Sequence, residues 1–354
     1  MQSPLPVRDG VNATRLRLPD EGPWTTAMDY MMHRWGHIDP QGIEDRFDAG
    51  EIVGEGGIRL DRATRLEDHT FIWYYRTLPP ESRIPVELDI LHQDAHLLVV
   101  DKPHFLPTTP GGTYIQESAL VRLRNQLNLP DLIPMHRLDR MTAGVLLLST
   151  NPETRGKYQV LFEKRQVQKE YECVSAAEPA PGFPAVDFPV VVRNRMTKSR
   201  SYLLAEVIEG EPNAETRIER LETFDGGNHQ DATGTPAASL EGTNPARLAR
   251  YRLEPHSGKT HQLRVHMASL GLGIVNDAFY PDLLDKAPDD YSKPLQLLAR
   301  GIRFVDPISN QPVEYRSRRE LSEAAQPEKS QTGDSETEPT QTESTQAQVI
   351  QTRP

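Results

Sequence analysis

Residues 135–150, which read M-H-R-L-D-R-M-T-A-G-V-L-L-L-S-T, decide the fold of this chain. A charged segment ending at Arg140 is followed by small residues and then by the apolar run at 145–148. An apolar run of this length between turn residues predicts a buried strand. Asp139 is therefore expected on a loop at the start of that strand, with Arg137 and Arg140 on either side of it.

This position makes Asp139 the candidate catalytic group. An ionised carboxylate on a stiff support is what a nucleophile or a base requires, and opposite charges within a few ångströms keep a carboxylate ionised where water is scarce. The alternative is a turn residue in a surface ion pair, because structural ion pairs perturb pKa values without any function.

The same stretch resembles the signature of the RluA-type pseudouridine synthases, with H-R-L-D-R at 136–140 followed by T-A-G at 142–144. Three further segments resemble motifs of that family in the same order. They are I-L-H-Q-D at 90–94 through L-L-V-V-D-K-P at 97–103, K-E-Y-E-C-V at 169–174, and H-S-G-K-T-H-Q-L-R-V-H at 256–266. The resemblance covers residues 86–320.

The resemblance implies the pseudouridine synthase fold, an α+β fold with a long mixed, mostly antiparallel sheet, flanking helices and a cleft across its middle. It also implies isomerisation of specific uridines in structured RNA, with ribosomal RNA favoured and transfer RNA as the alternative. The reaction breaks the sugar–nitrogen bond, turns the uracil and rejoins it through carbon, so no cofactor is expected. Because a stacked base is out of reach, the target nucleotide has to be flipped out.

By resemblance, the catalytic residues are Asp139, Tyr171 and Arg264. Arg264 would pair with Asp139 and hold it charged after water leaves the pocket, and its alternative is a surface arginine on a half-buried element. Tyr171 would stack on the uracil, and its hydroxyl would assist proton transfer from carbon five. The alternative for Tyr171 is a core tyrosine in an alternating strand.

The expected RNA-binding residues are all cationic: Arg137, Arg140, Lys102, Lys169 and Lys259. Arg137 resembles the arginine of the family that fills the space left by the flipped base or steadies that base, and a plain phosphate contact is the milder alternative. The lysines would contact backbone phosphates, or they are solvated surface lysines.

The histidines raise the question of a metal. His256, His261 and His266 recur every five residues, which places them on different faces of a helix, and no carboxylate pair completes a ligand set. No metal site is therefore expected. His136 is expected to hydrogen-bond the loop that carries Asp139.

The net charge of −11 counts against a nucleic-acid partner. The acidic residues are concentrated, however. Residues 206–241 contain nine acids and two bases, and residues 327–354 contain five acids and two bases, which leaves a net charge of −1 for the rest. A basic face elsewhere on the molecule is therefore compatible with the sequence.

The cellular compartment is indicated by Cys173, the single cysteine. It excludes an internal disulfide, fits a reducing compartment and is expected to be a small buried apolar residue. No run approaches the ~20 apolar residues of a membrane span, and the N-terminus lacks the pattern of a signal peptide. We expect a cytoplasmic protein without a membrane partner, and by resemblance a monomer.

The chain is expected to divide into an N-terminal extension at 1–80, a catalytic domain at 86–320 and a disordered acidic tail at 327–354. Residues 1–20 are expected as an extended arm. In the rest of the extension a helix is predicted within 24–35 and strands at 58–60 and 71–75. This pattern faintly resembles a small α+β RNA-binding domain first described in a small-subunit ribosomal protein, and a purely structural extension is the alternative. In the catalytic domain we predict helices at 117–127 and 154–163, and an acidic insert at 206–243 whose part from 226 is an exposed loop between two strands.

Two rival functions belong to other classes. An RNA-binding assembly factor could keep the fold and lose the chemistry, but the set of Asp139, Tyr171 and Arg264 argues against it. A nucleoside hydrolase would cleave the glycosidic bond, a reaction that usually employs two carboxylates. No second acid stands out in the motifs.

Overall fold

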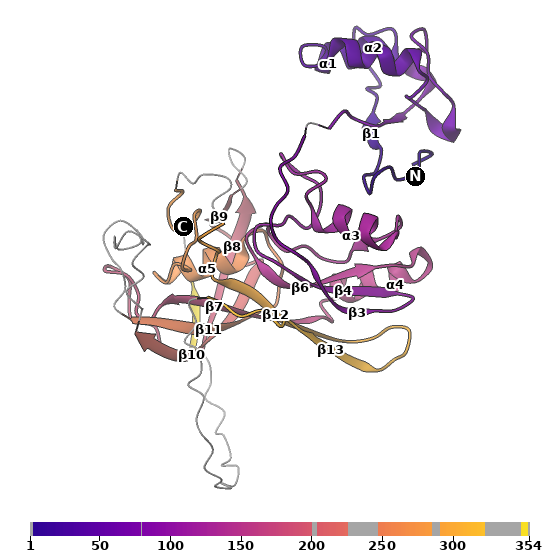
Figure 1. The fold of residues 1–354 in the computed structure, drawn as a ribbon. Coiled ribbons are helices and arrows are strands. Elements are labelled where there is room, and N and C mark those ends of the chain that lie inside the picture. The colour runs from indigo at the N-terminus through magenta and orange to yellow at the C-terminus, as the bar shows by residue number, and fades with distance from the viewer. Residues whose placement is uncertain are drawn as a thin grey trace. The chain divides into compact units, whose positions relative to one another are not determined.

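The computed structural model describes residues 3–78, 80–199, 204–225, 247–284, 291–322 and 348–352. The chain forms two compact units, which Figure 1 shows with their labelled elements. Unit 1 consists of Met1–Arg83 and Thr109–Leu132, and unit 2 consists of Ile84–Thr108 and Ile133–Pro354. The domain bounds expected from the sequence remain predictions.

Unit 1 combines short helices with a two-stranded sheet. Its elements are β1 (Thr14–Arg17), α1 (Ala27–Trp35), α2 (Pro40–Asp48), the 3-10 turns η1 (Glu55–Gly57) and η2 (Leu66–Asp68), β2 (Phe71–Tyr74) and α3 (Ala119–Leu127). α1 begins at a capping box formed by Thr26 and Asp29, and α2 begins with Pro40 behind an Asp39 cap. β1 pairs antiparallel with β2, and apolar side chains of α1, α2 and β2 share one core.

The structure confirms most of the predicted elements of this unit. The helix within 24–35 is α1, the strand at 71–75 is β2, and the helix at 117–127 is α3, capped by Ser118. The strand predicted at 58–60 is wrong. Because η1 folds the chain back on itself, only Arg59 of this stretch pairs there, in a single bridge with Val53.

Unit 2 is built on a large sheet. Its strands are β3 (Asp89–Gln93), β4 (Leu97–Lys102), β5 (Ile133–Pro134), β6 (Ala143–Ser149), β7 (Gln168–Ala176), β8 (Val190–Lys198), β9 (Ala205–Ile208), β10 (Ala214–Asp225), β11 (Arg247–Pro255), β12 (Leu297–Val305), β13 (Pro312–Arg316) and β14 (Gln348–Gln351). The order is β14-β8-β10-β11-β7-β12-β6-β4-β3, with β13 on β12, β5 on β6 and β9 on β8.

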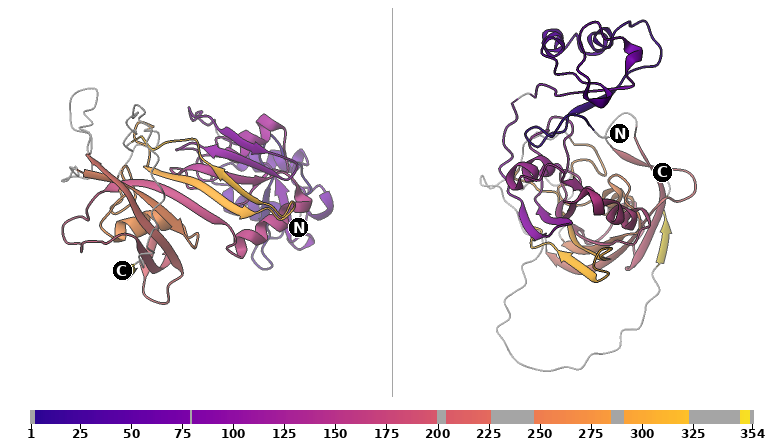
Figure 2. Two further views of the ribbon diagram at one scale, coloured as in Figure 1. Left: turned by 90° about the horizontal axis from the view of Figure 1, so that it is seen from below. Right: turned by 90° about the vertical axis from the view of Figure 1, so that its right-hand side faces the viewer.

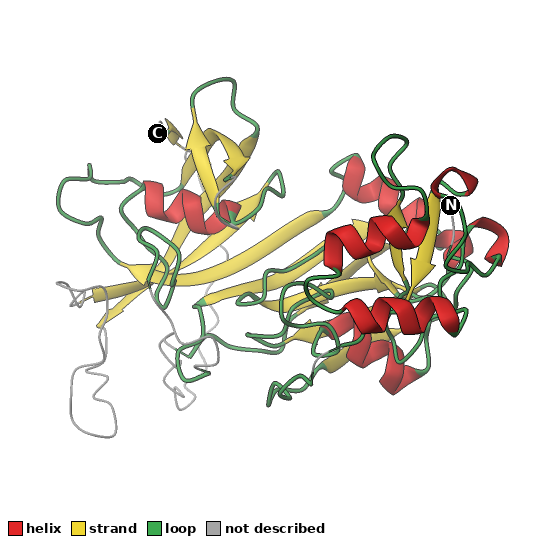
Figure 3. Ribbon diagram, turned by 90° about the horizontal axis from the view of Figure 1, so that it is seen from above, coloured by secondary structure: helices red, strands yellow, loops and turns green. Residues whose placement is uncertain are grey.

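The sheet is mixed and mostly antiparallel, as predicted. Only the pairs β12–β6 and β14–β8 are parallel among the described strands. Helix α4 (Pro152–Glu163), which corresponds to the helix predicted at 154–163, packs on β6, and α5 (Gln262–Ser269) packs against β9 and β10. Figure 3 shows these helices beside the long strands. None of the described helices is long and apolar enough to cross a bilayer.

The strand predicted from the apolar run is β6, and every one of its residues is buried. Gly144 explains the small residues before that run. Its φ is +111°, and a Cβ atom there would lie 2.2 Å from the carbonyl oxygen of Ala299 on β12. Only glycine allows β6 and β12 to approach this closely. The prediction for Cys173 is also confirmed, because it is fully buried on β7 and burial raises the pKa of its thiol.

The acidic segments are described only in part. The strands that flank the predicted loop are β10, which ends at Asp225, and its antiparallel partner β11, which begins at Arg247. The loop predicted at 226–243 lies outside the described residues, as do residues 327–347 of the predicted tail. Residues 348–351 contradict the prediction of a disordered tail, because they form β14, which extends the sheet beside β8 (Figure 2).

Candidate active site

Asp139 lies on the loop between β5 and β6, as predicted. Thr108 holds the backbone of the loop by two hydrogen bonds to Leu138. The Thr108 hydroxyl donates to the Leu138 carbonyl at 2.7 Å and accepts from the Leu138 N–H at 3.1 Å. A turn closes on the other side, where the N–H of Thr142 donates to the Asp139 carbonyl. The Asp139 side chain is 38% exposed. It is therefore held by its backbone while its carboxylate stays accessible.

Lys102 supports this loop from the interior. Its side chain is fully buried, and Nζ donates to the carbonyls of Pro103, Leu106 and Arg140 at 2.9, 2.8 and 3.4 Å. Burial lowers the pKa of Lys102 to about 7, while the nearby Asp139 carboxylate acts in the opposite direction. Three acceptors match the three protons of an ammonium group. The predicted phosphate contact of Lys102 is wrong for this structure, because Nζ is enclosed by protein.

The two arginines beside Asp139 do not pair with it. Arg137 is exposed, and Nε of Arg140 donates to the carbonyl of Phe105 at 2.9 Å. In the described part of the chain, the polar side chain that faces the Asp139 carboxylate is instead His261, whose Nε2 lies 3.7 Å from Oδ2 and which carries a charge only when protonated. Residues adjacent in sequence to Asp139 therefore do not supply its counter-charge.

Arg264 is, like Lys102, an enclosed cation of the site. It is 2% exposed, and its guanidinium forms a two-point ion pair with Asp277, with Nε donating to Oδ2 at 2.7 Å. The guanidinium also lies 4.8 Å from the ring centre of Phe279 and 5.3 Å from that of Tyr280. The predicted direct ion pair between Arg264 and Asp139 is wrong, because Asp277 occupies the guanidinium instead.

Asp139 nevertheless acts on Arg264 through space. Burial alone would lower the pKa of Arg264, but the hydrogen-bonded Asp277 carboxylate more than offsets burial and Asp139 adds to its effect, so that the pKa is raised. Asp277 is itself 5% exposed, and its Oδ1 accepts from the N–H groups of Phe279 and Tyr280. Arg264 is thus a fixed positive charge near Asp139, aimed by Asp277.

Tyr171, on β7, completes the predicted set. Its ring packs against the apolar cluster that contains Leu263 and Met267 of α5. Burial raises the pKa of its hydroxyl well above the ordinary value, and the Asp139 charge raises it further. The structure therefore places Tyr171 and Arg264, from two distant segments of the chain, within electrostatic reach of Asp139.

Three members of the site were not expected from the sequence: His261, Asp277 and Tyr280. His261 was singled out only as a metal ligand candidate, although it stands three residues before Arg264 in the late motif. Its Nδ1 lies 3.0 Å from the Tyr280 hydroxyl. Asp277 and Tyr280 follow the turn after α5, where no motif marked them.

The remaining predicted cations differ in exposure. Lys259 is exposed, whereas Lys169 is half-buried with its ammonium 5.5 Å from the Phe162 ring centre, and burial lowers its pKa. His136 was expected to hydrogen-bond the Asp139 loop, and this prediction is wrong. Its Nε2 accepts from the N–H of Leu147 on β6, and its ring stacks on Phe162.

The three histidines of the late motif lie in three different environments. His256 is exposed, His261 faces Asp139, and His266 is fully buried between Thr216 and Asn194. They therefore do not converge on one point.

Three neutral histidines that are largely or fully enclosed, His104, His136 and His266, predict that unit 2 is sensitive to acid. Burial lowers the pKa values of His104 and His266 to about 4 and that of His136 to about 3. Because the unfolded chain takes up these protons below pH 6.5, stability is complete above that pH and is lost as the pH falls toward 4. At pH 5 each histidine is expected to cost about 2 kcal/mol of unfolding free energy. Urea unfolding at pH 7.5 and pH 5 measures the loss, and an unchanged free energy would contradict it.

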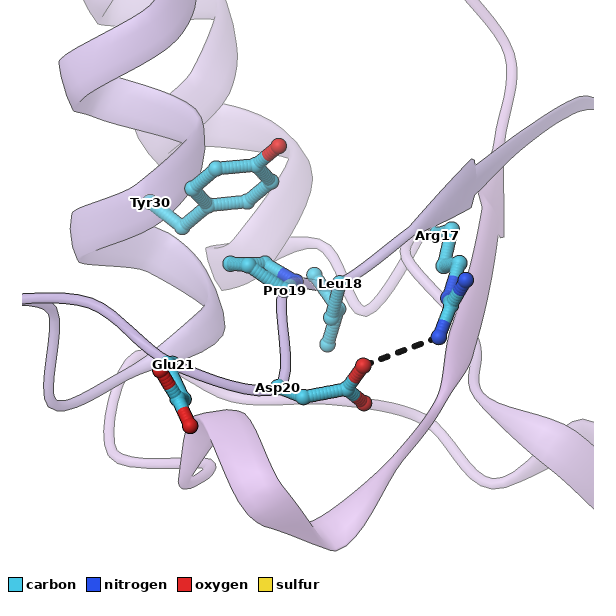
Figure 4. Close-up of a pocket in the computed structure, with 6 residues that line it drawn as sticks. All are labelled: Arg17, Leu18, Pro19, Asp20, Glu21 and Tyr30. Carbon is cyan, nitrogen blue, oxygen red and sulfur yellow. Dashed lines mark hydrogen bonds and ion pairs between the residues drawn. The ribbon is translucent and has the colours of Figure 1, made fainter.

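A shallow hollow lies in unit 1, lined by Arg17, Leu18, Pro19, Asp20, Glu21 and Tyr30 (Figure 4). Arg17 and Asp20 form an ion pair across it at 2.9 Å, but their side chains are 64% and 77% exposed. Such exposed pairs contribute little. The hollow shares no residue with the site around Asp139, and we assign no chemistry to it.

Comparison with known proteins places the site in context. The family model described as RNA pseudouridylate synthase matches residues 96–269, a span that holds Asp139, Tyr171, His261 and Arg264. An uncharacterized RNA pseudouridine synthase of Synechocystis is 26% identical over 260 residues, covering 72% of this chain and 78% of that protein. The dual-specificity RNA pseudouridine synthase RluA of Salmonella typhimurium is 29% identical over 224 residues, covering 62% of this chain and 88% of that protein.

A third relative and one solved structure complete the comparison. Bovine mitochondrial pseudouridylate synthase RPUSD4 is 31% identical over 221 residues, which cover 57% of this chain and 54% of that protein. The solved structure of human RNA pseudouridylate synthase domain containing 1 aligns with a TM-score of 0.47 at 23% identity, covering 68% of this chain and 86% of that one.

Proposed function

The chain belongs to the RluA-type family of RNA pseudouridine synthases, and we propose that it isomerises specific uridines of structured RNA through the Asp139 carboxylate, without a cofactor. Ribosomal RNA is the favoured substrate and transfer RNA is the alternative. One observation carries the proposal. Asp139 presents an accessible carboxylate on a fixed loop, within the electrostatic influence of the partly buried Tyr171 and His261 and the buried Arg264.

This arrangement suits a reaction in which charge develops on the sugar or the uracil ring. Arg264 is a preorganised positive charge in a poorly hydrated setting, where electrostatic interactions are stronger than in water. Asp277 holds it in place, so little reorganisation is needed when the substrate arrives. The chain's own residues can therefore hold the Asp139 loop and place a fixed positive charge near its carboxylate.

RNA contact is assigned to cations that remain accessible. Arg137 and Lys259 are exposed, and Lys169 is half-exposed. We propose that Arg137 enters the space left by the flipped uridine, since it stands two residues before Asp139 on the same loop. Lys259 would contact a phosphate beside the late motif. Arg140 is fixed by the Phe105 carbonyl and would contribute mainly by shaping the loop.

Tyr171→Phe is expected to preserve RNA binding and to slow release of the rearranged base. The phenyl ring still stacks on the uracil, but the hydroxyl that assists proton transfer from carbon five is lost. Because the pKa of Tyr171 is raised, the hydroxyl stays protonated at neutral pH, and it can serve only as a relay to a neighbour such as Asp139. Single-turnover kinetics measure this step. An unchanged rate would remove the proton-transfer role.

The substrate is identified by pseudouridine mapping of total RNA from cells with and without the gene, using carbodiimide modification and primer extension. Because one relative is named a dual-specificity enzyme, the map has to include both ribosomal and transfer RNA. We expect one or a few stops to disappear and to return only with a gene that encodes Asp139. An unchanged map in both RNA classes would favour the non-catalytic assembly factor.

We also propose a location and an oligomeric state. A cytoplasmic location is proposed because the single cysteine fits a reducing compartment. A monomeric state is proposed from the family resemblance. Cell fractionation and light scattering of the purified protein test the two separately.

A further inference from the structure

We propose that His261 is a positioning residue that presents an Nε2–H group to the Asp139 carboxylate, and that the Tyr280 hydroxyl selects the ring tautomer that makes this contact. The inference deepens the proposed function and rests on its assignment of Asp139 as the catalytic group. It concerns a residue that touches Asp139 and has so far been given no role in the chemistry.

The geometry places His261 between the two partners. It precedes α5 in a left-handed backbone conformation, with φ at +53°, and its side chain is only 9% exposed. One ring nitrogen, Nε2, lies 3.7 Å from Oδ2 of Asp139, and the other, Nδ1, lies 3.0 Å from the Tyr280 hydroxyl. The first distance exceeds that of a hydrogen bond, as is common for catalytic contacts that tighten only when substrate binds.

The hydrogen bonds around Tyr280 decide which nitrogen carries the proton. Its hydroxyl oxygen accepts from the N–H of Ala205 at 2.8 Å, so its own proton has two nearby acceptors. These are the carbonyl of Ala205 at 3.2 Å and Nδ1 of His261 at 3.0 Å. When the proton goes to Nδ1, the neutral ring must carry its hydrogen on Nε2, facing Asp139.

The opposite tautomer is disfavoured by charge. It would turn the lone pair of Nε2 toward a carboxylate, and two acceptors facing each other repel. The tautomer with hydrogen on Nε2 satisfies the Tyr280 hydroxyl and the Asp139 carboxylate together. The second nitrogen of a functional histidine commonly sets its tautomer in this way.

The surroundings keep this ring neutral. The charged groups that face it are Asp139, Arg264, Asp277 and Lys198. Burial lowers the pKa of His261. The carboxylates of Asp139 and Asp277 raise this pKa, while the positive charges of Arg264 and Lys198 lower it further. A neutral donor orients the carboxylate without cancelling its negative charge, whereas an arginine at this position would neutralise that charge.

Two conservative variants separate the two ends of the ring. In His261→Gln the amide group can reach the position of Nε2 and keep a donor toward Asp139, whereas in His261→Asn it can reach only the position of Nδ1 and the contact with Tyr280. We expect His261→Asn to lose about 10- to 100-fold in kcat with KM little changed. We expect His261→Gln to stay within about 5-fold of the wild type. His256→Gln, an exposed histidine of the same motif, is the matched control.

The tautomer is read directly by nitrogen NMR of the full chain labelled with ¹⁵N-histidine, using His261→Gln to assign the signal. We expect hydrogen on Nε2 in the wild type and a mixture of tautomers in Tyr280→Phe. Hydrogen on Nδ1 in the wild type, or equal kcat in the Asn and Gln variants, would overturn the proposal. The NMR measurement needs no RNA, so it stands even if His261→Asn fails to fold. If Asp139→Asn keeps its activity while the tautomer is as expected, the proposed function fails and the ring assignment does not.

Discussion

The Asp139→Asn variant is expected to bind RNA with near wild-type affinity and to form no detectable pseudouridine. Asparagine keeps the size of the side chain and the backbone bonds that hold the loop, but it lacks the negative charge and the nucleophilic oxygen. Loss of a group that reacts directly costs about 10⁴-fold or more in turnover. The purified variant is tested with a transcript that carries the mapped site. Filter binding measures the RNA affinity, and a pseudouridine assay measures turnover.

Asp187→Asn is a suitable control, because Asp187 is an exposed aspartate of the same unit that lies outside the site. It should leave binding and turnover unchanged. Retained turnover in Asp139→Asn would sink the proposed mechanism, because no other carboxylate of the described site is comparably accessible. Loss of binding together with turnover would instead mean that Asp139 holds the RNA.

The second large effect is expected from Asp277→Asn. The carboxylate of Asp277 neutralises the buried Arg264 guanidinium, and an amide in its place would turn N–H groups toward a cation. Removing one partner of a buried ion pair typically costs about 3–5 kcal/mol, because the other charge is left uncompensated. Turnover should fall about 100-fold as well, since Arg264 would no longer be aimed at the site. Urea unfolding and single-turnover assays on the same preparation measure the two losses.

The matched control is Glu254→Gln. Glu254 pairs with Arg217 at 3.3 Å, but the two side chains are 45% and 40% exposed, so the change should cost less than about 1 kcal/mol. A variant Asp277→Asn as stable as this control would show that Arg264 finds another partner. Full stability with lost turnover would assign Asp277 to the chemistry alone.

The local elements were largely predictable. The buried strand β6 follows from an apolar run between turn residues, and α1, α3 and α4 follow from apolar spacing and capping residues. These features depend on neighbours within a few positions, which the sequence displays directly. The strand predicted at 58–60 is wrong because a local feature overrides its apolar residues. The turn at residues 55–57 limits how much of the stretch can pair. β14 was missed because its two apolar residues, Val349 and Ile350, stand in an otherwise polar tail and its pairing partner β8 is far away in the sequence.

The candidate site was predictable as a set of residues but not as a set of contacts. The motifs identified Asp139, Tyr171 and Arg264, and the structure places them near one another. The partner of Arg264 is Asp277 rather than Asp139, and Lys102 is enclosed instead of exposed. Motif spacing shows which residues are present, while ion pairing depends on distances of a few ångströms that packing sets.

The sequence by itself predicted the resemblance to the RNA pseudouridine synthases, the loop and strand that carry Asp139 and the buried character of Cys173. Only the tertiary structure decided which charge Asp139 faces, what holds Arg264 and where the Lys102 ammonium lies. The physical reason is range. Strand and helix signals are written in neighbouring residues, but burial and charge pairing arise where segments far apart in the chain meet, as α5, the turn after it and the Asp139 loop do here.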